Sequence, residues 1–212
     1  MSDSRRAELA RYGIPEAGIA MLEKYLVELE LWNARLRLVD ANGEELFVRH
    51  VLDCAAGART IGERRGGKAT DLVDIGSGAG FPGIVLAAAF PEWRVVLVER
   101  SGRACGFLRN AIAVSGAVNV EVLESEFESI DRTFDVVTFR AFRPISRRVV
   151  EGLARITRRD GFVAAYKAKR TTIDAELSGL SASGLPVSDL EIVAVSPPFD
   201  AERNVVFFTP FS

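Results

Sequence analysis

Apolar residues in the first 65 positions recur at the spacing of a helix. The residues of this stripe are three or four positions apart: Ile19, Leu22, Leu26, Leu29, Trp32 and Leu36. Such spacing places side chains on one helix face, and a second helix is predicted over residues 44–64. The Arg65-Gly66-Gly67-Lys68 stretch then breaks the pattern. We therefore predict a helical N-terminal extension over residues 1–68 and a second domain over residues 69–212.

Beyond residue 69, short apolar runs alternate with helical patterns. The runs predict strands over residues 72–75, 95–98, 120–123, 136–139 and 162–166. Helices are predicted between them over residues 82–90, 102–115 and 146–156. Residues 192–195 and 205–208 predict a closing antiparallel pair. Buried strands joined by helices indicate an α/β fold of the Rossmann-like kind, a mostly parallel twisted sheet with helices on both faces.

Composition narrows the class of protein. The chain has 212 residues, of which 48% are hydrophobic and 26% charged, enough to bury a sizeable core. No apolar run approaches the roughly 20 residues of a membrane span, and the polar start does not resemble a signal peptide, so we expect a cytoplasmic protein. Two isolated cysteines, Cys54 and Cys105, predict no disulfide framework and no metal cluster.

Charge is distributed unevenly along the chain. The net charge of −2 argues against a protein whose whole surface binds nucleic acid. Residues 140–170 nevertheless hold ten cations and two acids, a net +8, which leaves −10 for the remainder. The cations are Arg140, Arg143, Arg147, Arg148, Arg155, Arg158, Arg159, Lys167, Lys169 and Arg170. This segment predicts either one face that binds a polyanion or ordinary solvated helix faces.

A glycine-rich segment follows the first predicted strand. Its sequence is Asp74-Ile75-Gly76-Ser77-Gly78-Ala79-Gly80-Phe81-Pro82-Gly83. A tight turn accounts for one glycine but not for Gly76, Gly78 and Gly80 together, so we predict that the loop approaches a ligand at the carboxyl edge of the sheet. A dinucleotide fingerprint has Gly or Ala where this chain has Phe81. The bulky side chain disfavours a diphosphate and permits a smaller amino-acid moiety, such as that of S-adenosyl-L-methionine.

The next two strands add candidate cofactor contacts. Glu99 ends the second strand about 20 residues downstream, where a carboxylate can accept hydrogen bonds from both ribose hydroxyls. Ser125 and Glu126 follow the third strand, where an adenine ring could lie near Phe127. An ordinary loop remains the alternative for these residues.

These motifs, with several others, resemble one family. Leu31-Trp32-Asn33, Arg49-His50-Val51-Leu52-Asp53, the glycine segment, Phe139-Arg140-Ala141-Phe142 and Lys167 are similar to the bacterial small-subunit ribosomal RNA guanine-N7 methyltransferases, the glucose-inhibited division protein B family. The resemblance covers most of the chain. It implies a class I methyltransferase fold and transfer of a methyl group from S-adenosyl-L-methionine to N7 of a guanosine in 16S ribosomal RNA or the small ribosomal subunit. We also expect a monomer.

The resemblance also implies residue roles. It implies cofactor contacts by Gly76, Phe81, Ser125, Glu126 and Arg140, and we predict that Arg140 and Lys167 hold the reactants in line. The chain departs from the family at three positions: Cys54 replaces a serine, Glu124 an arginine and Asn204 a histidine. A basic terminus is also missing after Ser212. These departures affect the expected RNA footprint and not the cofactor site.

His50, the sole histidine, has two interpretations. It could be a general base, but we favour a structural histidine that pairs with Asp53 or caps a helix. Guanine N7 already carries a free lone pair, so catalysis can depend on alignment. Two other functions remain open: a methyltransferase for another RNA, a small molecule or a protein, and a nucleotide-binding regulatory module without catalysis.

Overall fold

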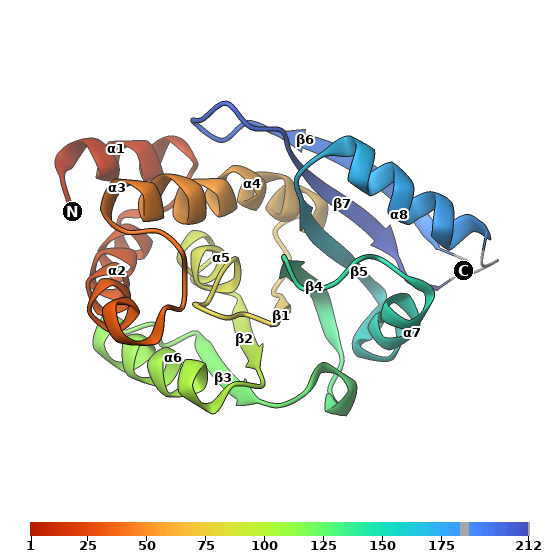
Figure 1. Ribbon diagram of the computed structural model, residues 1–212, viewed down its shortest axis with the longest axis horizontal. Coiled ribbons are helices and arrows are strands. Elements are labelled where there is room, and N and C mark those ends of the chain that lie inside the picture. Colours follow the sequence, from red (N-terminus) through yellow and green to blue (C-terminus); the bar gives the residue numbers. More distant parts are fainter. Residues whose placement is uncertain (183–186, 212) are drawn as a thin grey trace.

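The computed structural model describes residues 1–182 and 187–211, and a seven-stranded sheet forms their centre (Figure 1). The strands are β1 (Asp71–Ile75), β2 (Arg94–Glu99), β3 (Val120–Glu124), β4 (Phe134–Arg140), β5 (Thr157–Lys167), β6 (Ser188–Val195) and β7 (Arg203–Thr209). Their order is β3-β2-β1-β4-β5-β7-β6. The first five are parallel, and β7 runs antiparallel to both of its neighbours. The predicted fold class is confirmed.

Helices cover both faces of this sheet. They are α1 (Asp3–Arg11), α2 (Glu16–Leu36), α3 (Gly43–Leu46), the π-helical η1 (Phe47–Leu52), α4 (Asp53–Arg65), α5 (Gly83–Ala89), α6 (Gly102–Ser115), α7 (Arg147–Ile156) and α8 (Arg170–Ala182), with a short 3₁₀ turn, η2 (Phe127–Ser129). Leu72 of β1 faces the core formed with α2, α4, α5 and α6, whereas Val73 faces the core formed with α7 and α8. Because side chains alternate along a strand, strands covered on both faces are mostly apolar.

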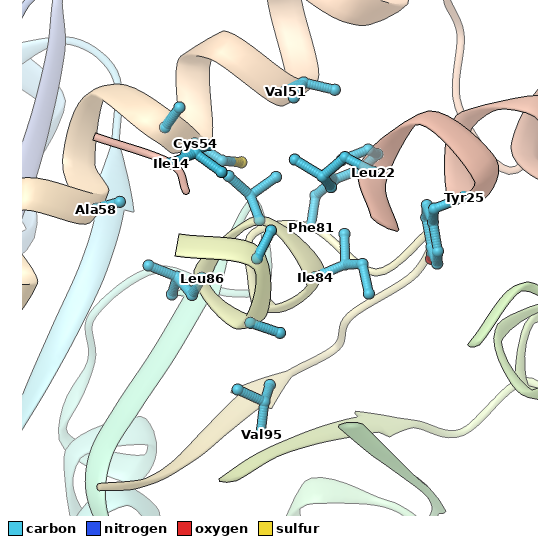
Figure 2. Close-up of a cluster of buried hydrophobic side chains, with 14 of the residues drawn as sticks. Ile14, Leu22, Tyr25, Val51, Cys54, Ala58, Phe81, Ile84, Leu86 and Val95 are labelled. Atoms are coloured by element: carbon cyan, nitrogen blue, oxygen red, sulfur yellow. The ribbon is translucent and has the colours of Figure 1, made fainter. Parts of the chain in front are cut away.

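The N-terminal helices pack directly onto the sheet domain. Leu22 and Tyr25 of α2 share one buried cluster with Phe81 and Ile84 (Figure 2). A side chain at Gly18 would lie 2.1 Å from the carbonyl oxygen of Ala88 in α5, so the two helix backbones are in contact. The predicted boundary at residue 68 follows the end of α4, but the core continues across it. Whether residues 1–68 and 69–212 are separate domains therefore stays a prediction.

Several elements differ from the prediction, and β6 begins at Ser188, four residues before its predicted start. The helix predicted over residues 44–64 is interrupted by the π-helical turn η1. Strand β5 begins at Thr157, five residues before the predicted start at residue 162. Arg158 pairs with Asp71 and Asp135 at this end of the sheet. Because the first residues of the strand include charged side chains, they do not form an apolar run. Helix α8 was not predicted, since its threonines and serines weaken the helical signal.

Several further properties bear on the class of protein. Both cysteines are buried and unbridged. Within residues 1–182 and 187–211, no helix combines the length and the apolar character needed to cross a membrane. The same residues contain no group of three or more His, Cys, Asp or Glu side chains placed to hold a metal ion.

Candidate active site

The glycine loop lies at the carboxyl edge of the sheet. After β1 ends at Ile75, the backbone N–H groups of Gly76 and Ser77 donate to the carbonyl oxygen of Val98, at 2.9 and 3.1 Å. The loop therefore crosses the end of β2 before α5 begins. Gly76 has a φ of 68°, which an L side chain rarely adopts.

A pocket of about 170 Å³ opens beside this loop. Its lining comes from the ends of β1, β2 and β3 and from the segment after β4: Ile75, Gly76, Val98, Glu99, Arg100, Ser125, Glu126, Phe127, Phe142 and Arg143. Four predicted cofactor residues, Gly76, Glu99, Ser125 and Glu126, therefore meet at one cavity. Phe127 lines it as well, as expected for the adenine side. Contact of these residues with a cofactor stays a prediction.

The other predicted cofactor residues lie outside that lining. Gly80 packs against α2, where a side chain would lie 2.3 Å from the hydroxyl of Tyr25. Phe81 is 4% exposed in the core, and its ring centroid lies 5.6 Å from that of His50. The N–H of Gly78 donates to Glu99 Oε2 at 3.0 Å. Their direct contact with a cofactor also stays a prediction.

Glu99 is held in place by backbone donors. Its Oε1 accepts from the N–H groups of Arg100 and Ser101, at 2.9 and 2.8 Å, while Oε2 accepts from Gly78. An ionised carboxylate offers about four acceptor sites. About one remains free, so a ligand that donates two hydrogen bonds to Glu99 would displace one of these N–H groups.

Asp74 is a buried carboxylate behind the glycine loop. Its Oδ2 accepts from the N–H of Gly83 at 2.9 Å, while Oδ1 has no hydrogen-bond partner among the described residues. Burial raises the pKa of Asp74 to about 7, although the Gly83 N–H and the nearby Arg140 charge both favour the ionised form. Asp74 therefore changes charge near neutral pH.

A second pocket, of about 520 Å³, adjoins the first. Phe142 and Arg143 line both, so the two cavities share a wall. Both predicted catalytic residues, Arg140 and Lys167, line the second pocket and are absent from the lining of the first. Arg140 is therefore placed toward the second cavity, although the resemblance implied a cofactor contact, which stays a prediction.

Arg140 is anchored by the N-terminal extension. Its guanidinium donates to Asp53 Oδ2 at 3.1 Å and to the carbonyl oxygen of Arg49 at 3.3 Å, and it lies 2.6 Å from His50 Nδ1. The predicted pairing of His50 with Asp53 is wrong: both side chains bind Arg140 instead. Because arginine only donates, His50 Nδ1 must accept and the ring is neutral. Burial and the neighbouring Arg140 charge lower the pKa of His50 to about 4.

Asp53 and Lys167 each bind a charged residue that no sequence motif indicated. Asp53 Oδ1 accepts from Arg203 Nε at 2.9 Å. Lys167 Nζ donates to Glu176 of α8, at 2.7 Å to Oε2 and 3.0 Å to Oε1. Arg203 and Glu176 lie in elements that carry no recognisable motif, and only the folded chain brings them to the pocket.

The basic segment is largely neutralised by ion pairs. Seven of its ten cations form them: Arg140 with Asp53, Arg143 and Arg148 with Glu128, Arg147 with Glu151, Arg158 with Asp71 and Asp135, Lys167 with Glu176, and Arg170 with Asp174. Most of these carboxylates lie outside residues 140–170. The net +8 counted along the chain thus overstates the charge available to a polyanion.

The three departures from the family pattern lie at different places. Cys54 is buried in the core, and Glu124 pairs with Arg109 at 2.9 Å. Asn204 lines the second pocket and donates to the carbonyl oxygen of Ala168 at 2.7 Å. Among the three, only Asn204 lies where it could influence an acceptor.

Comparison with known proteins identifies the family of this chain. The family model of GidB, described as rRNA small subunit methyltransferase G, matches residues 18–205. The chain is 34% identical over 199 residues to the ribosomal RNA small subunit methyltransferase G of Treponema pallidum, covering 90% of this chain and 85% of that protein. It is 35% identical over 188 residues to the protein of the same name from Borrelia turicatae, covering 88% and 87%.

Solved structures share the fold. A precorrin-6y C5,15-methyltransferase from Geobacter metallireducens superposes with a TM-score of 0.54 at 19% identity, over 73% of this chain and 87% of that one. Human methyltransferase 10 domain containing protein gives a TM-score of 0.59 at 13% identity, over 90% and 98%. At such identities the likeness is one of fold alone. The family match and the sequence relatives decide the assignment, and the chain belongs to the GidB family of small-subunit rRNA methyltransferases.

Proposed function

We propose that this protein transfers a methyl group from S-adenosyl-L-methionine to N7 of a guanosine in 16S ribosomal RNA. The observation that carries the proposal is the pair of pockets that share Phe142 and Arg143. A donor in one cavity and a base in the other can meet at that wall, as a direct displacement requires. Family membership supports the ribosomal substrate.

The first pocket fits the cofactor. Glu99 would bind the ribose, Phe127 would face the adenine, and Gly76 leaves room beside Phe142 because it has no side chain. When bound, the cofactor supplies a methyl group on a positively charged sulfonium. Residues of the first pocket would hold that group near Phe142 and Arg143, which also line the second pocket. Protein groups therefore act mainly by alignment, which can lower a barrier by roughly 7 to 11 kcal/mol in well-oriented systems.

Replacing Glu99 by alanine is expected to weaken S-adenosylhomocysteine binding. The loss is expected to be about 1.5 to 3 kcal/mol, because the variant removes a hydrogen bond to a charged acceptor. It also frees the Gly78 N–H that Glu99 fixes. Isothermal titration calorimetry measures the effect, and Glu121→Ala, an exposed carboxylate on β3, is the control. An affinity equal to that of the wild type would remove Glu99 from the site.

The acceptor needs no general base. Guanine N7 attacks through a lone pair that is free in the neutral base, so no proton has to leave before the methyl group is transferred. His50 is neutral, and its Nδ1 is occupied by Arg140. These contacts assign His50 to the support of Arg140 and not to proton transfer.

The single-turnover rate is therefore expected to show no histidine titration between pH 6 and 8. The pKa of His50 is lowered to about 4, so the ring stays neutral throughout that range. His50→Ala should retain much of the rate if the protein is folded. Any inflection near pH 7 in the dependence of the rate on pH is expected to arise from Asp74, whose pKa is raised by burial to about 7. Asp74→Asn should abolish that inflection and His50→Ala should not.

A contrary result would change the proposed identity of the acceptor atom. A rate that falls roughly tenfold per pH unit below pH 7 in Asp74→Asn would show that a proton must leave. The acceptor would then be an exocyclic amine or a hydroxyl, and the guanine-N7 assignment would be withdrawn.

The function is tested by incubating the protein with labelled cofactor and small ribosomal subunits or total RNA from methylation-deficient cells. We expect label in 16S RNA. N7-methylguanosine is identified because its strand becomes cleavable after borohydride and aniline treatment. Label in another RNA, a protein or a small molecule would favour the alternative methyltransferase, and tight cofactor binding without any transfer would favour a regulatory module.

We also propose that the protein acts in the cytoplasm as a monomer. The proposed substrate is ribosomal, which supports the cytoplasmic location. Light scattering coupled to gel filtration tests the monomeric state, and localisation of a tagged protein tests the cytoplasmic location.

A further inference from the structure

The Lys167–Glu176 pair forms part of the wall of the second pocket. Its side chains are only 14% and 12% exposed, yet both line the cavity. Taking two charges out of water has a cost that pairing offsets only in part. Ligand pockets typically contain a few such polar groups, which fix the orientation of the ligand.

Each member of the pair can offer one hydrogen-bonding site to a ligand. Lys167 has three N–H donors, which contact both oxygens of Glu176 and, at 3.4 Å, the carbonyl oxygen of Arg143. The contact with Arg143 is the longest of the three, so a ligand oxygen can replace it. Glu176 Oε2 accepts from Lys167 and from the N–H of Ile145, whereas Oε1 accepts from Lys167. A donor and an acceptor therefore stand side by side in the pocket.

The other charged groups of the pocket are arranged differently. Arg140 and Arg203 only donate, and each oxygen of Asp53 accepts from one of these two arginines. Asp53 and Glu176 are the two carboxylates that line this cavity. Glu176 is the one that pairs with Lys167.

We propose that Lys167 and Glu176 read the edge of the target guanine, with Lys167 donating to O6 and Glu176 accepting from N1–H. This inference rests on the proposed function. N7, O6 and N1–H follow one another around the edge of guanine. Lys167 contacts both Arg143, at the shared wall, and Glu176. A guanine with N7 at the shared wall would thus present an acceptor to Lys167 and a donor to Glu176.

The same arrangement rejects adenine. Adenine has an amine in place of O6 and a bare lone pair at N1, so a donor would face Lys167 and an acceptor would face Glu176. Sites built to pair buried polar groups discriminate strongly, because the wrong ligand leaves those groups unpaired. Inosine keeps both O6 and N1–H, and it should be accepted.

The proposal is tested by binding of three mononucleotides to protein saturated with S-adenosylhomocysteine. We expect guanosine and inosine monophosphates to bind wild type at least roughly tenfold more tightly than adenosine monophosphate. In Glu176→Gln that ratio should fall toward one, because a glutamine amide can donate to adenine N1. Single-turnover methylation of small subunits should slow roughly 10- to 100-fold, with cofactor affinity unchanged within about twofold.

Asp174→Asn provides the matched control. Asp174 lies on the same helix, is 54% exposed and pairs with Arg170, so its replacement should change neither the ratio nor the rate. Equal or absent binding of the three nucleotides by wild type would overturn the proposal. So would a Glu176→Gln variant that loses thermal stability or cofactor affinity but keeps the ratio, because Glu176 would then only support the loop through Ile145.

Failure of the proposed function gives a different result. If the wild type discriminates guanine but transfers no label to small-subunit RNA, the pocket recognises guanine and the reaction assignment is wrong. If label is transferred to N7 without discrimination among nucleotides, the reaction stands and the role of Glu176 is withdrawn.

Discussion

Gly76→Ala is expected to reduce cofactor affinity by roughly 10- to 100-fold, about 1.4 to 2.7 kcal/mol. The new methyl group would lie 2.7 Å from Phe142, whose ring lines both pockets, so that ring must move. The alanine must also adopt a φ of 68°, which adds about 1 to 2 kcal/mol of strain. Calorimetry with S-adenosylhomocysteine measures the first effect, and chemical denaturation measures the second.

Gly78→Ala separates the two causes. Gly78 also has a positive φ, of 55°, but a methyl group there would have open space within 4 Å. This control should lose stability comparably while keeping most of its cofactor affinity. Equal losses of affinity in the two variants would show that backbone strain, and not the collision with Phe142, limits binding.

Local signals in the sequence were sufficient for the parallel sheet and for one pocket. Strands buried on both faces produce continuous apolar runs, and the glycine loop must follow the first of them. Because parallel strands end at the same edge, Glu99 and Ser125 were expected to meet Gly76, and they line one cavity with it.

The second pocket could not be predicted in the same way, because its contacts join distant segments. Asp53 and Arg140 are 87 residues apart, and Asp53 and Arg203 are 150 apart. Glu176 lies on a helix whose polar composition gave no signal. The basic segment shows the same limit: charge counted along a chain takes no account of the carboxylates that the fold brings beside each cation.

Asp53→Ala is expected to lower the free energy of unfolding by roughly 3 kcal/mol and to slow methyl transfer, with little change in cofactor affinity. Asp53 is 4% exposed and accepts from both Arg140 and Arg203. Removing one partner of a buried ion pair typically costs about 3 to 5 kcal/mol, because the remaining charge is left without compensation. We expect the lower end because the two arginine side chains are 18% and 24% exposed.

A surface pair on the same helix is the control for this prediction. Glu63 on α4 pairs with Arg59, and both are largely exposed, so Glu63→Ala should change stability by less than about 1 kcal/mol. In the double variant Asp53→Ala/Arg140→Ala, the stability loss should be smaller than the sum of the two single losses, because the isolated charge has been removed. Additive losses would show that Asp53 and Arg140 act independently. The slower methyl transfer would then have to arise from Arg203, the other arginine that Asp53 holds at the pocket.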